Sequence, residues 1–107
     1  MRAFDIPALI GEMQQDKWCE ILRAPSLSMG IYHLKAGDAD GQSPHTEDEV
    51  YYVVSGRACF RAGGEERQVA PGTILFVERL VDHSFFDVRE DLTLLVLFAP
   101  PERTGHA

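Results

Sequence analysis

Eight short segments rich in β-branched and aromatic residues run through this chain, and glycine or proline turns separate most of them. Such segments are typical of β-strands, because these side chains pack well on a pleated surface. Eight strands in 107 residues leave little room for other elements, so we predict an all-β fold, an antiparallel sandwich or small barrel. The predicted strands are 17–23, 27–35, 49–54, 57–61, 66–69, 73–77, 83–88 and 92–98.

The two ends of the chain depart from this pattern. Apolar residues spaced three and four apart predict a short helix over about 6–15, with Asp5 as its N-cap and Pro7 at its first position, although Gly11 weakens this prediction. Pro100 and Pro101 end the last strand, and 102–107 are expected to form a loose tail. We find neither a repeat nor a linker and expect one domain over 1–107.

Composition excludes several classes of function. The chain is 45% apolar, which suffices for one core, and its net charge of -7 opposes binding to nucleic acids and anionic membranes. The N-terminus lacks the pattern of a secretory signal, and no apolar run is long enough to span a membrane, so a cytoplasmic protein is expected. Cys19 and Cys59 lie far apart and are expected to be free thiols.

The side chains with the most chemistry lie at the entrance to one predicted strand. His45, Glu47 and Glu49 occupy alternate positions, so they are expected on one face of the sheet. His83, farther along, is the candidate partner. Imidazole nitrogen and carboxylate oxygen suit Fe, Mn, Co, Ni or Zn, and two histidines with one carboxylate leave coordination positions open, as in non-haem iron oxygenases. Glu47 and Tyr51 are candidate proton-transfer groups.

The other histidines are weaker candidates. His33 lies on an apolar strand and is expected to be a hydrogen-bonded sheet residue, and His106 lies in the predicted tail. A fourth ligand for the predicted site is an open question, with Ser43, Gln42, Glu47 and water as the alternatives. Large apolar residues such as Tyr51, Phe76 and Phe85 are expected in the core or lining a pocket.

Two stretches resemble the paired motifs of the cupin superfamily, small β-barrels of the jelly-roll type. The first motif is a glycine, five residues, His-x-His, three or four residues, glutamate, six residues and a glycine. The matching positions are Gly37, Ser43, His45, Glu49 and Gly56. Ser43 therefore stands where the motif has its first histidine.

The second motif is a glycine, five residues, Pro-x-Gly, two residues, histidine, three residues and asparagine. Gly72 and His83 keep its spacing, while Glu78, Leu80 and Asp87 replace the proline, the second glycine and the asparagine. The resemblance covers 27–98 and is greatest to small single-domain cupins of the cupin 2 type. It implies a divalent metal in the barrel held by His45, Glu49 and His83, with Ser43 at the position of the family's fourth ligand.

The leading hypothesis for function is therefore a metal-dependent enzyme, of dioxygenase or isomerase type, that acts on a small organic molecule. In it His45, Glu49 and His83 hold the metal (Fe, Mn, Ni or Zn), and Glu47 or Tyr51 moves protons. The alternatives are a non-catalytic sensor or ligand-binding module on the same barrel, and a barrel without metal. The resemblance also implies a homodimer.

Overall fold

The computed structural model describes residues 1–41 and 44–103 and contains one helix and eight strands in these ranges. Helix α1 spans Ile6–Met13, shorter than expected, because Gln14 adopts a positive φ of 54° that is incompatible with a further turn. Asp5 occupies the N-cap position without a side-chain hydrogen bond, and Pro7 is the second helical residue. The strands are β1 Trp18–Arg23, β2 Ser28–Leu34, β3 Asp48–Ser55, β4 Ala58–Ala62, β5 Glu65–Val69, β6 Ile74–Val77, β7 His83–Phe86 and β8 Leu92–Ala99.

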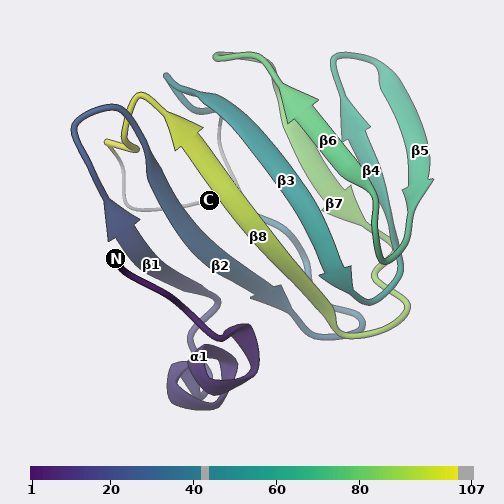
Figure 1. Ribbon diagram of the computed structural model, residues 1–107. Helices are drawn as coiled ribbons and strands as arrows, with labels where there is room; N and C mark the ends of the chain where they lie inside the picture. The colour runs from purple at the N-terminus through teal and green to yellow at the C-terminus, as the bar shows by residue number, and fades with distance from the viewer. Residues whose placement is uncertain (42–43, 104–107) are drawn as a thin grey trace.

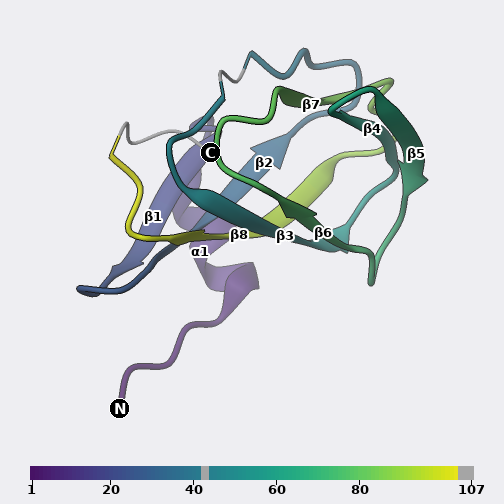
Figure 2. The same ribbon diagram turned by 90° about the horizontal axis from the view of Figure 1, so that it is seen from above.

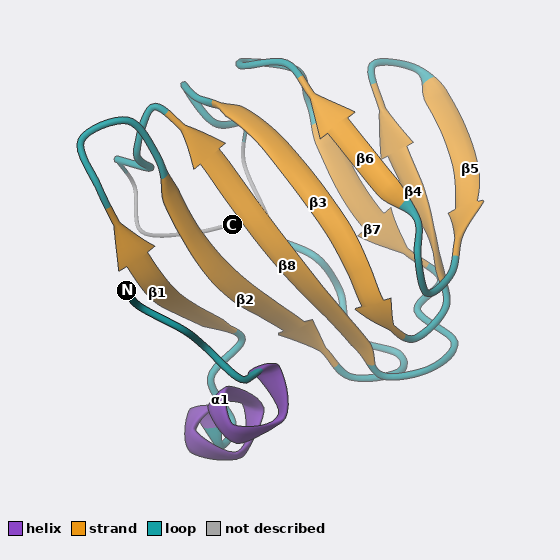
Figure 3. Cartoon of the chain, viewed as in Figure 1, coloured by secondary structure: helices purple, strands orange, loops and turns teal. Residues whose placement is uncertain are grey.

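The strands form two antiparallel sheets, and Figure 2 shows them on opposite sides of the core. The larger sheet has the order β1-β2-β8-β3-β6, and the smaller one has the order β5-β4-β7 (Figures 1 and 3). Among the described residues no ladder of hydrogen bonds joins the two sheets into one closed barrel. The predicted all-β, jelly-roll type of fold with an N-terminal helix is confirmed, in the form of a sandwich.

The turn between β4 and β5 shows how the local sequence sets the register. Ala62 pairs with Glu65, which leaves only Gly63 and Gly64 in the loop, at φ values of 55° and 87°. A two-residue hairpin of this kind needs positive φ at both positions, which glycine adopts without steric cost.

The core lies between the sheets and consists of the inward side chains of both. On β3 and β8 every second residue is fully buried, among them Tyr51, Val53, Leu94 and Val96, as the period of two in a strand requires. Burying each large apolar side chain contributes about 1.5–3 kcal/mol. Phe76 was expected in the core or lining a pocket but is 62% exposed, because it faces outward from β6 between the buried Leu75 and Val77.

The long connection from β2 to β3 is tied to both sheets by one side chain. Asp40 accepts a hydrogen bond from the Tyr32 hydroxyl of β2 at 2.7 Å and another from the Phe85 amide of β7 at 2.8 Å. The first residues after β2 therefore have a defined path toward the start of β3. In the described part of the chain, no helix is long and apolar enough to cross a membrane.

Candidate metal centre

His45, Glu47 and Glu49 lie on one face, as predicted. Glu49 is the second residue of β3, and the alternation of the strand continues backward through the two residues that precede it. The three side chains are 4%, 1% and 1% exposed, whereas Thr46 and Asp48 between them are exposed. Glu47 therefore points inward, and Thr46 donates a hydrogen bond to its carboxylate.

His83 is the first residue of β7, in the opposite sheet, and the turn before it is fastened to the other half of the site. The Leu80 amide donates a hydrogen bond to the His45 carbonyl at 2.7 Å, and the Arg79 amide donates one to the Asp48 carboxylate at 2.9 Å. Leu80 has a φ of 67°. These bonds hold the β6–β7 turn against the entrance to β3 and bring His83 toward Glu49.

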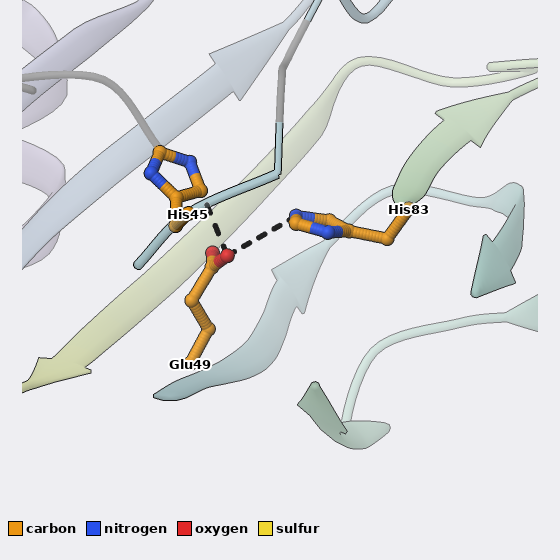
Figure 4. Close-up of side chains that lie close together, drawn as sticks. All are labelled: His45, Glu49 and His83. Atoms are coloured by element: carbon orange, nitrogen blue, oxygen red, sulfur yellow. Dashed lines mark ion pairs between the residues drawn. The ribbon is translucent and has the colours of Figure 1, made fainter. Parts of the chain in front are cut away.

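The three predicted metal ligands converge. His45, Glu49 and His83 each offer one nitrogen or oxygen, and these atoms all lie within 4.8 Å of one another. His83 Nε2 is 3.2 Å and His45 Nε2 is 3.9 Å from Glu49 Oε1, and Figure 4 shows both rings turned toward the carboxylate. The Tyr51 hydroxyl lies 3.0 Å from His83 Nε2, so the predicted proton-transfer residue contacts a predicted ligand.

The other ring nitrogen of each histidine points away from Glu49. His83 Nδ1 is 2.9 Å from the Val81 carbonyl, which can only accept, so this nitrogen carries a proton. Burial lowers the pKa of His83, but the hydrogen bond with Glu49, the bond with Val81 and the nearby carboxylate charges outweigh burial and raise it overall. His45 Nδ1 lies 3.4 Å from Glu102 Oε2.

Glu102 is a part of the site that was not predicted. It was expected to begin a loose tail after the two prolines, but it is 1% exposed and its main chain is hydrogen-bonded to Ser28 and Arg23. Residues 104–107 of the predicted tail, His106 among them, lie outside the described residues. A glutamate after two prolines carries no sequence signal that distinguishes it from a solvated one.

The residues present fit a divalent cation. Three carboxylates, those of Glu47, Glu49 and Glu102, are buried around two imidazoles, and buried negative charge is costly unless a cation or hydrogen bonds offset it. Glu47 Oε1 and Glu49 Oε2 are buried without a hydrogen-bond partner in the described part of the chain. Imidazole and carboxylate are ligands that suit divalent transition metals.

Aromatic side chains surround the ligands. The Phe98 ring centroid lies 5.0 Å from that of His45, and Trp18 packs edge-on against Phe98 at 6.0 Å. On the other side Phe60 and Tyr51 lie 6.1 Å and 5.9 Å from His83. Such apolar walls exclude water and strengthen the electrostatic interactions inside the site.

The remaining candidates lie elsewhere. His33 Nδ1 is 3.0 Å from the Thr93 hydroxyl, which confirms its expected role as a hydrogen-bonded sheet residue. Cys19 and Cys59 are half-buried free thiols, as expected. Gln42 and Ser43, two of the proposed fourth ligands, lie outside the described residues.

Comparison with known proteins gives consistent matches. A family model described as a cupin domain matches residues 30–99. An uncharacterized protein of Streptomyces coelicolor is 44% identical over 104 residues, covering 95% of this chain and 99% of that protein. A solved structure from Thermus thermophilus has a TM-score of 0.76 and 28% identity, covering 94% of this chain and 99% of the other. The DMSP lyase DddQ of Ruegeria pomeroyi has a TM-score of 0.69 and 22% identity, covering 78% of this chain and 47% of the lyase.

Proposed function

This chain belongs to the cupin family, and on that basis we propose that it is a metal-dependent enzyme acting on a small organic molecule. His45, Glu49 and His83 would hold the metal. The observation that carries the proposal is their convergence: three buried donor atoms from two sheets lie within 4.8 Å of one another. Buried histidines and a glutamate that meet in this way are costly in a protein core unless they bind a cation or one another.

A metal bound there supplies a Lewis acid that polarises a substrate oxygen or, for iron, a centre that activates dioxygen. Two histidines and one carboxylate leave coordination positions for a substrate, which favours a dioxygenase or an isomerase over a purely structural site. Cupin folds support enzymes, as the name of the DMSP lyase shows for that protein. The Fe, Mn, Ni and Zn ions remain the candidates.

Tyr51 has a defined chemical role in this proposal. Its hydroxyl is 3.0 Å from His83 Nε2, and Nδ1 of that ring is occupied by the Val81 carbonyl. A metal held by Nε2 of the neutral His83 ring would take the place of this contact, and the Tyr51 hydroxyl would then lie beside the bound substrate. A hydroxyl in that position is placed to donate a proton.

Glu47 supplies a complementary base. Its carboxylate is buried, is held at Oε2 by Thr46 and has Oε1 without a hydrogen-bond partner among the described residues. The open oxygen is the atom that would accept a proton from a bound substrate. Tyr51 and Glu47 together would therefore move protons in opposite directions.

The proposal is tested first by metal binding. Purified protein, stripped with a chelator, should bind one equivalent of Fe(II), Mn(II), Ni(II) or Zn(II) in calorimetry, and His45→Ala and His83→Ala should each abolish this. His33→Ala is the matched control, because His33 is bonded to Thr93 on the outer face of its strand. Failure of the wild type to bind any of these ions contradicts the proposal.

Turnover is tested second. Oxygen uptake after anaerobic Fe(II) loading, with pools of small organic acids, sugars and phenols, tests the dioxygenase form. Product analysis by NMR with Zn(II) or Mn(II) tests the isomerase form. Metal binding without turnover of any pool would favour a non-catalytic binding or sensor module. One observation favours that second candidate: all three ligand side chains are 4% exposed or less, so solvent has little access to them.

A further inference from the structure

We propose that Glu102 is a positioning residue for the metal, and that docking of the segment after β8 is coupled to metal binding through it. This inference rests on the proposed metal site. Glu102 holds the ring of His45 so that its Nε2 faces Glu49. The part of the chain that follows the last strand would thereby complete a site in which two of the ligands, His45 and Glu49, lie more than fifty positions earlier, around the start of β3.

The main chain of Glu102 is anchored at both of its polar atoms. Its amide donates a hydrogen bond at 2.8 Å to Ser28 Oγ, which is fully buried at the start of β2. Its carbonyl accepts a bond at 2.6 Å from Arg23 at the end of β1, and the Arg23 guanidinium is itself held by Glu20 at 2.7 Å and 3.2 Å. Side chains of β1 and β2 therefore hold Glu102 in its buried position.

The side chain of Glu102 determines the tautomer of His45. Its Oε2 lies 3.4 Å from His45 Nδ1, and an ionised carboxylate can only accept a hydrogen bond. The proton of a neutral His45 ring is therefore placed on Nδ1. The lone pair is left on Nε2, which lies 3.9 Å from Glu49 Oε1 and is the nitrogen turned toward the other ligands (Figure 4).

His83 receives the same orientation by a different device. There the Val81 carbonyl, two residues away, accepts from Nδ1 at 2.9 Å, and Nε2 faces Glu49. The two ligand rings are thus set in equivalent states, one by a local main-chain carbonyl and the other by a distant carboxylate. Groups that orient a ligating histidine in this way typically change metal affinity by about 10–100-fold when removed.

The test compares Glu102→Ala and Glu102→Gln with the wild type in two measurements. Nitrogen-15 NMR of the imidazoles in the metal-free protein should show Nδ1–H at His45 in the wild type and a mixture of tautomers in Glu102→Ala. Zinc affinity should fall about 10–100-fold in Glu102→Ala and much less in Glu102→Gln, which keeps an acceptor oxygen. Glu66→Ala is the control, because its carboxylate pairs with Arg61 on the exposed hairpin.

A second measurement uses the unaltered protein. The Glu102 amide, bonded to Ser28, should exchange its hydrogen more slowly when zinc is bound, while amides of the β4–β5 hairpin should not change. If a folded Glu102→Ala protein keeps the His45 tautomer and the zinc affinity of the wild type, the inference about Glu102 is overturned while the proposed function stands. The same holds if the exchange rate of the Glu102 amide does not change when zinc is added. A wild type that binds no metal overturns the proposed function and, with it, the coupling.

Discussion

Replacing Tyr51 with phenylalanine should tighten metal binding, although it removes a residue from the site. The Tyr51 hydroxyl lies 3.0 Å from His83 Nε2, in a position that is fully buried. When the metal-free protein has a neutral His83 ring, the hydroxyl hydrogen-bonds to this nitrogen, and a metal must displace that bond. A buried hydrogen bond contributes about 0.5–1.5 kcal/mol. The bond to His83 is made only without metal, so its removal should tighten metal binding by about 1 kcal/mol, which is roughly fivefold.

Two measurements on Tyr51→Phe check this reasoning. Urea unfolding of the metal-free variant should show a loss of about 1 kcal/mol, and zinc calorimetry should show an affinity gain of the same size. Tyr52→Phe is the matched control, because Tyr52 is the next residue on β3 and faces outward. Any turnover should fall in Tyr51→Phe if the hydroxyl donates a proton. Weaker zinc binding in a folded Tyr51→Phe protein would refute the proposed competition.

Three further predictions concern the metal, a close packing contact and pH. Zinc at a hundredfold excess over its dissociation constant should raise the free energy of unfolding by about 2.7 kcal/mol and the thermal midpoint by roughly 10–20 °C. A chelator should reverse this shift in a thermal melt, and an unchanged midpoint would count against the site. Gly30→Ala should lower the free energy of unfolding by about 1–3 kcal/mol in urea denaturation, because the added Cβ would lie 2.3 Å from the Trp18 ring. Gly11→Ala in α1, whose Cβ would meet nothing within 4 Å, should raise this free energy by about 0.5–1 kcal/mol. Equal effects of the two substitutions would contradict the packing argument. In the metal-free protein burial lowers the pKa of His83, but the hydrogen bonds that the protonated ring makes with Glu49 and Val81 outweigh burial, so this pKa is raised. The contribution of His83 to stability is therefore fully present below about pH 6.5 and is lost as pH rises through the pKa of the folded protein. The free energy of unfolding of the wild type should exceed that of His83→Asn by less at about pH 8 than at about pH 6. A difference that grew with pH would contradict the assignment.

The strands could be predicted because their composition and turns agree with the final structure. All eight lie where the segments of β-branched and aromatic residues predict them, with ends displaced by one or two residues. The face of β6 could not be predicted, because Ile74, Leu75, Phe76 and Val77 are apolar without interruption. An alternating pattern would have separated the inward from the outward residues, and here Phe76 was assigned to the wrong side.

The three candidate metal ligands could be predicted because two of them are local. His45 and Glu49 share a face through the period of the strand, and the motif spacing supplied His83. Glu102 could not be predicted, because nothing near it in the chain indicates burial. Its position depends on hydrogen bonds to Ser28 and Arg23, which are distant in sequence and approach it only when β1, β2 and β8 have paired.

The candidate ligands come from both sheets, so the distances between their donor atoms depend on how far apart the two sheets lie. His45 and Glu49 move with the large sheet and His83 moves with the small one. Aromatic packing separates the sheets near the site: the Tyr51 ring of the large sheet lies 5.1 Å from Phe85 and 5.8 Å from Phe60, both in the small sheet. A preference for one ion over another of different radius would then be set by the thickness of the hydrophobic core. Size changes at Phe60 or Phe85, neither a ligand, should change which metal the protein selects.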